Sequence, residues 1–232
     1  MKSTPRFRGP SLILLATVHI LIFAAGLVAA GALRHGASYV NPFAPGEQVR
    51  LFFAQNPTAK RVSSFFLFGS AVPFGIFAVT TISRLRFMGV RAAGTNVALL
   101  GGLAATIALM LSGIAGWVLS VPEVASSTPV VKAVAFLNFL CGGMFYAVGF
   151  GLLAAGVSGT SYFMRLLPRW LSVLGIFLAI TGELSSLSLL TYPANFFISI
   201  TRFVGFVRMV LTAIALTRNR RTAPAAAAAN AV

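Results

Sequence analysis

Residues 95–120 read TNVALLGGLAATIALMLSGIAGWVLS and contain no charged side chain. An α-helix rises about 1.5 Å per residue, so about 20 apolar residues cross the hydrocarbon core of a bilayer. This run exceeds that length, and a water-soluble protein does not need so long a segment without a charged side chain. It therefore predicts a transmembrane helix.

Five further runs have the same character. Over the whole chain, 58% of the residues are hydrophobic and only 9% are charged, whereas soluble domains carry about 25% charged residues. We therefore predict an all-α fold, a polytopic bundle of six transmembrane helices in one domain at 11–217. A basic arm at 1–10 precedes it, and an Ala/Pro-rich tail at 218–232 is predicted to be disordered. The spans are predicted at 11–33, 63–82, 95–120, 133–158, 170–191 and 196–217.

The positive charge predicts the orientation. The chain has 18 Lys and Arg against 3 acidic residues. The N-terminal arm, the second and fourth loops and the tail hold 11 of the cations, whereas the other three loops hold 5. The positive-inside rule places the richer side in the cytoplasm, so both termini are predicted there. These cations are expected to meet anionic lipid headgroups. Nucleic acid is not an expected partner, because no soluble basic domain exists to bind it.

The first run has two interpretations. A basic arm, an apolar stretch and the small residues at 29–32 are typical of a signal peptide, but about 22 apolar residues exceed the usual 7–15 of a cleaved signal. An uncleaved signal-anchor is the favoured interpretation. In the loop that follows, residues 47–55 predict a short helix in the membrane interface, with Leu51, Phe52 and Phe53 entering the headgroup boundary.

Two rows of small residues are candidate helix-packing ridges. Lipid tails provide no hydrophobic force between helices, so close backbone approach at small residues helps to hold a bundle together. Frequent Gly and Ala in the chain would produce such rows without any packing role. The rows have a spacing of four residues and are Gly143, Ala147, Gly151 and Ala155 in the fourth span, and Ala104, Ala108, Ser112 and Gly116 in the third.

Few ionisable residues fall within the spans, and they form the candidate polar site. A charge at mid-bilayer costs about 2.5–3.5 kcal/mol, so each needs a partner or a wet cavity. In a simple hairpin of the last two spans, Glu183 lies level with residue 205, within reach of Arg202 or Arg208. The two arginines are about 120° apart on the helix, so only one is expected to pair with Glu183. Asn138 is expected to join from the fourth span.

His19 is the other polar candidate inside a span. A helix–helix hydrogen bond is the plainer interpretation, and a quinone, proton or haem site is the alternative; His35 is the only other histidine. The sequence contains no Asp, one Cys and no metal-binding or nucleotide-binding motif. We therefore expect no catalytic residues, no metal and no cofactor.

Three segments carry a resemblance. They are LLPRWLSVLG at 166–175, TRFVGFVR at 201–208 and FGSAVP at 68–73. Spans two to six resemble an uncharacterised family of bacterial multi-pass membrane proteins, a domain of unknown function. Relatives often carry Trp where this chain has Arg208. The resemblance implies a protein of the bacterial inner membrane and implies no activity, cofactor or catalytic residue.

Two functional hypotheses follow. The first is an accessory or interaction component of the inner membrane without enzymatic activity, working with another membrane protein or a second copy of itself. The alternative is a small transporter or channel that uses Glu183 with Arg202 or Arg208 for an anionic or proton-coupled substrate. A water-connected cavity at these residues favours the second hypothesis, and a dry ion pair favours the first.

Overall fold

The computed structural model describes residue 7 and residues 9–34 and 36–218. This described part is helical and contains no β-strand. Six of its helices are long and apolar enough to cross a membrane, so the chain is a multi-pass membrane protein and the predicted all-α bundle is confirmed. The first three spans are α1 (Leu12–Leu33), α3 (Pro57–Phe87) and α4 (Gly94–Val118). The fourth span consists of α6 (Thr128–Leu140), the π-helical segment η1 (Cys141–Phe145) and α7 (Tyr146–Met164). The fifth is α8 (Arg169–Leu184) extended by the 3-10 segment η2 (Ser185–Leu189), and the sixth is α9 (Asn195–Arg218), which follows the 3-10 segment η3 (Tyr192–Ala194).

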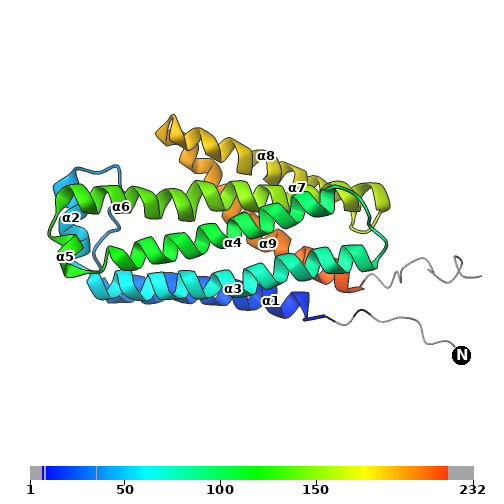
Figure 1. The fold of residues 1–232 in the computed structure, drawn as a ribbon, viewed down its shortest axis with the longest axis horizontal. Helices are drawn as coiled ribbons and strands as arrows, with labels where there is room; N and C mark the ends of the chain where they lie inside the picture. The colour runs from blue at the N-terminus through cyan, green and yellow to red at the C-terminus, as the bar shows by residue number, and fades with distance from the viewer. Residues whose placement is uncertain (1–6, 8, 35, 219–232) are drawn as a thin grey trace, which may run out of the picture.

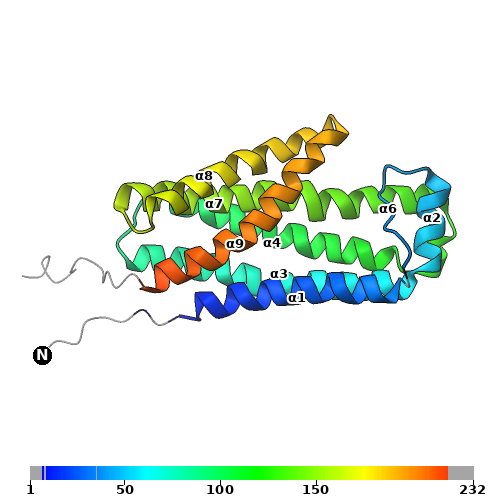
Figure 2. The ribbon, with the colours of Figure 1, turned by 180° about the vertical axis from the view of Figure 1, so that it is seen from behind.

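The six spans form a closed ring in chain order. Each packs on the next one along the chain, and α9 returns to contact α1. The described chain begins and ends at the same end of the bundle, as the even number of spans requires (Figures 1 and 2). Figure 2 shows α9 crossing the bundle obliquely: its C-terminal half lies near the start of α1, and its N-terminal half diverges toward the turn with α8.

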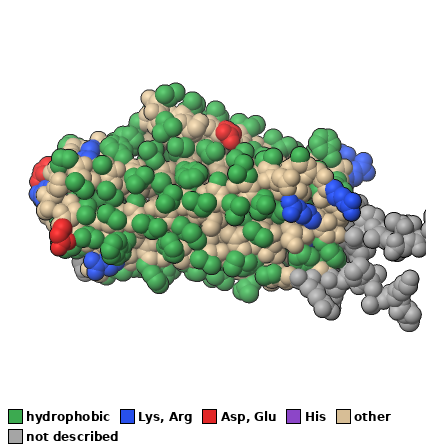
Figure 3. Space-filling view, in the orientation of Figure 1, with side chains coloured by type: hydrophobic (Ala, Val, Ile, Leu, Met, Phe, Trp, Pro, Cys, Tyr) green, Lys and Arg blue, Asp and Glu red, His purple; other side chains and the backbone are tan. Residues whose placement is uncertain are grey.

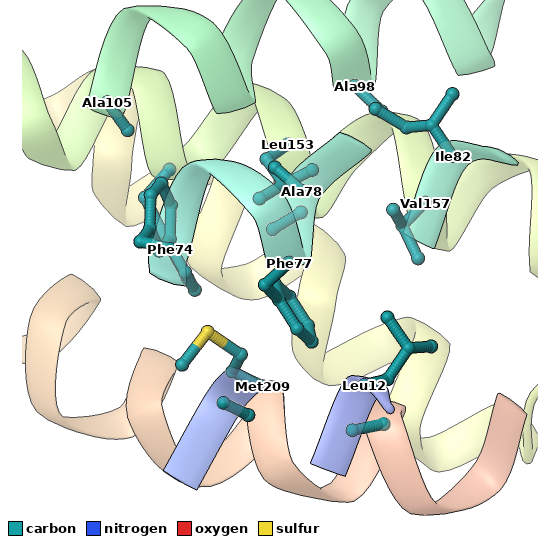
Figure 4. Close-up of a cluster of buried hydrophobic side chains, with 14 of the residues drawn as sticks. Leu12, Phe74, Phe77, Ala78, Ile82, Ala98, Ala105, Leu153, Val157 and Met209 are labelled. Atoms are coloured by element: carbon teal, nitrogen blue, oxygen red, sulfur yellow. The ribbon is translucent and has the colours of Figure 1, made fainter. Parts of the chain in front are cut away.

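The surface has the polarity of a membrane protein. Large apolar side chains of α4 point outward, with Leu100 63%, Ile107 50% and Ile114 51% exposed. Figure 3 shows hydrophobic side chains over the middle of one face and most Lys and Arg near the two ends. Inside, aromatic and aliphatic side chains from α1, α3, α4, α7 and α9 form one core (Figure 4). Phe74 of α3 is at its centre and is fully buried.

The closest helix contact joins α4 and α7 in an antiparallel register. A Cβ on Gly149 would lie 2.6 Å from the backbone nitrogen of Ala105 and 3.0 Å from the carbonyl oxygen of Gly101. A Cβ on Gly156 would lie 2.6 Å from the backbone nitrogen of Ala98. Glycine at these positions lets the two backbones touch, which is how helices associate without a hydrophobic driving force.

The short helix α2 (Gly46–Gln55) closes one end of the bundle, together with α5 (Pro122–Ala125). The helix itself agrees with the sequence prediction, but its orientation does not. Phe52 and Phe53 are buried against the bundle, and Val49 is fully buried with them. Only Leu51 is exposed, at 41%. The prediction that all three apolar residues enter the headgroup boundary was therefore wrong: α2 packs on α6 and on the ends of α3 and α4.

The second and fourth spans start six and five residues earlier than the sequence predicts, and they end later, at Phe87 and Met164. The second span begins at Pro57 and not at residue 63, because Pro57 occupies the first turn, where a missing N–H costs nothing. Lys60 is therefore helical and not part of a loop. The fourth span begins at Thr128, the first residue of α6, again with a proline in its first turn. The predicted tail beyond residue 218, most of the predicted arm and His35 lie outside the described residues.

Candidate functional site

Glu183 is not part of the polar site that the sequence predicts. Its side chain is exposed on α8, and the one ion pair among the described residues joins Arg50 to Glu47. The simple hairpin assumed from the sequence does not form, because η2 and η3 intervene between α8 and α9. The buried positions beside it are Thr181 and Gly182 of α8 and Ser185 at the start of η2, so Glu183 points away from the bundle interior. The predicted pairing was wrong.

Arg202 points into the bundle from α9 and is half-buried. Its Nη2 donates to the carbonyl oxygen of Gly142 in the π-helical segment. The guanidinium carbon lies 5.0 Å from the ring centroid of Tyr146 and 5.5 Å from that of Phe23, so two aromatic faces flank the charge. Its Nε is buried without a hydrogen-bond partner among the described residues. The charge is thus positioned by the protein without being neutralised.

Lys60 brings a second cation to the same region from α3. Its Nζ donates to Oδ1 of Asn138 at 2.9 Å, which uses one of the three ammonium donors. Asn138 in turn donates to the carbonyl oxygen of Ser112 at 2.6 Å. Asn138 and Gly142 are four residues apart, so the groups that hold Lys60 and Arg202 are roughly 6 Å apart along one helix.

A cavity of about 530 Å³ adjoins these residues, between α1, α3, α6 and α9. Lys60, Asn138 and Arg202 line it, with Asn195 at the start of α9 and Arg34 at the end of α1. Both Asn195 side-chain atoms are buried and have no hydrogen-bond partner in the described part of the chain. Native proteins rarely leave such atoms unsatisfied, so they indicate a polar occupant, either water or a ligand. The remaining walls are mostly apolar, and we call this space the cationic cavity.

The cationic cavity contains no carboxylate. The whole sequence has 3 acidic residues, and all of them are described and exposed: Glu47, Glu123 and Glu183. None lines the cavity. Lys60 and Arg202 therefore have no carboxylate beside them in the cavity, an unusual condition for groups within membrane-spanning helices.

Arg208 lies elsewhere, as its 120° rotation from Arg202 predicts. It is buried, with 3% of its surface exposed, between α7, α8 and α9. Its Nη2 donates to Oγ of Ser158 at 2.7 Å. A Cβ on Gly175 would lie 2.5 Å from its Nε, so glycine on α8 makes room for the guanidinium. Arg208 does not line the cationic cavity, and it ties three helices together.

His19 is a buried helix–helix contact. Its Nδ1 lies 2.8 Å from the carbonyl oxygen of Ser70, on α3. Its ring packs at 5.2 Å from Phe74 and 5.4 Å from Phe206, centroid to centroid. No group of three His, Cys, Asp or Glu in the described residues is placed to hold a metal ion. The geometry is that of the plainer interpretation, a hydrogen bond between α1 and α3.

The predicted ridge of the fourth span faces α8 and α9. A Cβ on Gly151 would lie 3.3 Å from the carbonyl oxygen of Ala179, and one on Gly182 would lie 2.6 Å from that of Ala147. A Cβ on Gly143 would meet Ile198 of α9 at 3.2 Å. Ala155, the last residue of the ridge, is half-buried.

The predicted ridge of the third span has several neighbours. Gly116 faces Lys60 and Ser64 of α3, and Ser112 faces Asn138. Ala108 is fully buried, and Ala104 is half-buried.

The sequence predicted neither Lys60 nor Asn195 as a site residue. Lys60 was assigned to a loop because helix hydropathy falls before residue 63, although Pro57 is a helix-start signal that places it one turn inside. Asn195 was assigned to a turn. The seven-residue spacing of Gly94 with Gly101, and of Gly149 with Gly156, was the available signal for the α4–α7 contact. Comparisons with protein-family models, curated protein sequences and solved structures give no match.

Proposed function

We propose that this protein binds a negatively charged ligand within the membrane, in the cationic cavity, as a receptor or a carrier. The observation that carries the proposal is the charge imbalance: Lys60 and Arg202 line one cavity, while every carboxylate of the chain is exposed elsewhere. An uncompensated charge within a membrane span is costly, and a bound anion offsets that cost for both cations. The orphaned atoms of Asn195 add hydrogen-bonding capacity at the same place.

The proposal includes a location and an orientation. The resemblance noted above supports a bacterial inner membrane. The end of the bundle opposite α2 carries Arg84, Arg86, Arg91, Arg165, Arg169 and Arg218. Placed in the cytoplasm, these residues satisfy the positive-inside rule and meet anionic lipid headgroups there. The cationic cavity then lies in the outer half of the membrane.

An accessory role without ligand is the second candidate, and Arg208 favours it. This arginine is buried, bonded to Ser158 and outside the cationic cavity. It shows that the chain also uses a buried cation to join helices. In that role the protein supports a membrane-protein partner or a second copy of itself, and its polar interior serves only cohesion.

Thermal unfolding in a neutral detergent separates the two candidates. Sodium phosphate, added at constant ionic strength, is expected to raise the midpoint by roughly 3–6 °C at ten times its dissociation constant. Lys60→Met and Arg202→Met, which keep an unbranched side chain of similar bulk and remove the charge, are expected to abolish this shift. Arg86→Met is the matched control, because Arg86 is exposed at the other end of α3.

The variants provide a second signature. Without added anion, removal of an uncompensated cation is expected to leave stability unchanged or to increase it. A phosphate-dependent shift that survives in both variants, or the absence of any shift in the wild type, contradicts the anion-binding proposal and favours the accessory role.

A further inference from the structure

From the shape of the cationic cavity we infer that its ligand is a phosphate-bearing lipid, which enters sideways from the bilayer between α1 and α9. This inference rests on the proposed function and names the ligand class. It depends on four features of the cavity: where it opens, what covers its end, how its polarity is distributed and how large it is.

The cavity opens on the side of the bundle, where α9 leaves α1. The two helices touch through Phe206, which packs on His19 and on Phe23 with ring centroids 5.4 Å and 5.2 Å apart. The N-terminal half of α9 diverges from α1 toward the turn with α8 (Figure 2). From there the cavity is lined by Leu27 of α1, which is 55% exposed, and by Ser199 of α9, which is also exposed. Both residues lie within spans, so this opening faces lipid.

The end of the cavity is covered by α2 and the loop before it. Phe52 packs on Tyr39 with ring centroids 5.6 Å apart, and both line the cavity. Lys132 of α6 fastens the loop, because its Nζ donates to the carbonyl oxygens of Pro42 and Ala44 at 2.7 and 2.8 Å. Phe43 adds an aromatic contact with Tyr192 of the α8–α9 connection at 4.9 Å. A ligand that arrives from water is therefore blocked by α2 and its loop, whereas one that arrives from the membrane reaches the opening between α1 and α9.

The cavity has a charged, polar part and an apolar part, as an amphiphilic ligand does. Lys60, Arg202 and Asn195 supply the charges and the unsatisfied polar atoms. Leu27 and Ile198, on the two helices of the opening, are apolar. The phosphate of a lipid has the charge to meet both cations, and its tail has an apolar exit between α1 and α9.

The volume favours a ligand larger than a free anion. A cavity of about 530 Å³ is in the range of sites for drug-sized molecules. It equals many water volumes of about 30 Å³ each, so inorganic phosphate would occupy only a small part of it. A headgroup with the first segment of an acyl chain fills the polar and the apolar parts together.

The inference is tested with three probes in a neutral detergent: inorganic phosphate, dodecyl phosphate and uncharged dodecanol. Each is titrated against the thermal midpoint of the wild type, and phosphatidic acid in nanodiscs provides a lipid arm, with phosphatidylcholine nanodiscs as reference. We expect dodecyl phosphate to give its half-maximal shift at a concentration about tenfold or more below that of inorganic phosphate, because burial of apolar carbon adds to the charge interaction. Dodecanol is expected to give no shift, and phosphatidic acid to stabilise the wild type but not Arg202→Met.

A pair of variants tests the sideways entrance. Ala30→Trp places a large ring on the cavity-lining face of α1, and Ala32→Trp places the same ring on an exposed face two residues away. Ala30→Trp is expected to remove the advantage of dodecyl phosphate over inorganic phosphate and to leave inorganic phosphate binding intact. Ala32→Trp is expected to leave both unchanged.

The outcomes separate this inference from the proposed function. If inorganic phosphate binds through Lys60 and Arg202 and dodecyl phosphate binds no more tightly, the lipid inference is overturned and anion binding stands. If dodecanol stabilises as well as dodecyl phosphate, the lipid inference alone is overturned, and if no phosphate compound stabilises, both the inference and the proposed function are overturned. Unchanged dodecyl phosphate binding in Ala30→Trp overturns the entrance between α1 and α9.

Discussion

Asn138 and Ser112 exchange hydrogen bonds in both directions across the contact between α6 and α4. The Asn138 amide donates to the Ser112 carbonyl oxygen at 2.6 Å, and the Ser112 hydroxyl donates to the Asn138 carbonyl oxygen at 2.8 Å. The same Asn138 side chain accepts from Lys60 at 2.9 Å. The π-helical segment that follows begins at Cys141, and such segments alter the backbone hydrogen bonding of a helix, often at functional sites. One amide thus joins three helices beside the cationic cavity.

Asn138→Leu is expected to lower the free energy of unfolding by about 2 kcal/mol. It removes the hydrogen bonds of the Asn138 side chain to Ser112 and Lys60, and such bonds in membrane proteins contribute about 0.6 kcal/mol on average and up to about 1.7. Ser112→Ala keeps the carbonyl partner and is expected to cost about half as much. Thermal unfolding in a neutral detergent measures both, and a wild-type midpoint for Asn138→Leu would show that this network does not stabilise the fold.

Alanine substitutions at three glycines of α7 are expected to have very different effects on the free energy of unfolding. Gly149→Ala places a Cβ 2.6 Å from the Ala105 backbone nitrogen, so α4 and α7 must separate, and we expect a loss of roughly 1–3 kcal/mol. Gly151→Ala meets the Ala179 carbonyl oxygen at 3.3 Å and is expected to be nearly neutral.

Gly159→Ala is the matched control for these two variants, because a Cβ there meets nothing within 4 Å. Gly159→Ala is expected to be neutral or stabilising, since alanine favours a helix by up to about 1 kcal/mol over glycine. Equal midpoints for all three variants would contradict the close contact between α4 and α7.

Glu183→Gln is expected to leave both stability and phosphate binding unchanged. Glu183 is exposed on α8 and takes part in no ion pair among the described residues, and substitutions of that kind usually stay within about 0.5 kcal/mol. The same titration of the thermal midpoint with sodium phosphate measures the effect. A loss of phosphate binding in Glu183→Gln would instead support the pairing of Glu183 with Arg202 or Arg208 that the sequence predicts.

The contact of α2 with α6 is expected to weaken at acidic pH. Hydrogen bonds from Arg50 hold the pKa of Glu47 below its ordinary value of 4.5, and Thr128 of α6 also donates to this carboxylate, at 3.1 Å. Because the pKa is lower in the folded protein, the stabilisation is complete above the ordinary value and is lost as the pH falls through the folded one. The midpoint difference between wild type and Glu47→Gln should therefore be small but measurable at neutral pH and should disappear in acid. A midpoint difference that grows as the pH falls would contradict this prediction.

Both ends of the chain are expected to be cytoplasmic. The described chain begins and ends at one end of the bundle, and the arginines of the second and fourth loops lie at that end. Single cysteines placed at Ser83 and at Ser126, in a Cys141→Ser background, are expected to react with a membrane-impermeant maleimide from opposite sides of the membrane. Both positions are exposed, and they lie at opposite ends of the bundle. Labelling of Ser83→Cys in intact cells would show that the orientation is the opposite of the predicted one.

The sequence predicted the candidate site only in part. It identified Arg202 and Asn138 as unusual polar groups within spans, and both line the cationic cavity. It paired Arg202 or Arg208 with Glu183, which required an unbroken hairpin and a particular rotation of α8. It placed Lys60 outside the helices, because a lysine at the edge of an apolar run lowers the local hydropathy whether or not its side chain turns inward.

The number and chain order of the spanning helices were determined by the sequence alone, since each apolar run is long enough to cross a bilayer. Runs of apolar residues of that length must leave water, and in lipid their backbone groups must bond within the segment, so each run becomes a helix whatever its neighbours do. The rotation of each helix and the oblique path of α9 were decided by the tertiary structure. They depend on where Gly149 and Gly156 allow backbones to touch and on how Phe206 packs against α1, which are contacts between residues far apart in the chain. For that reason the cationic cavity, which is lined by both Lys60 and Arg202 and by no carboxylate, exists only in the folded bundle.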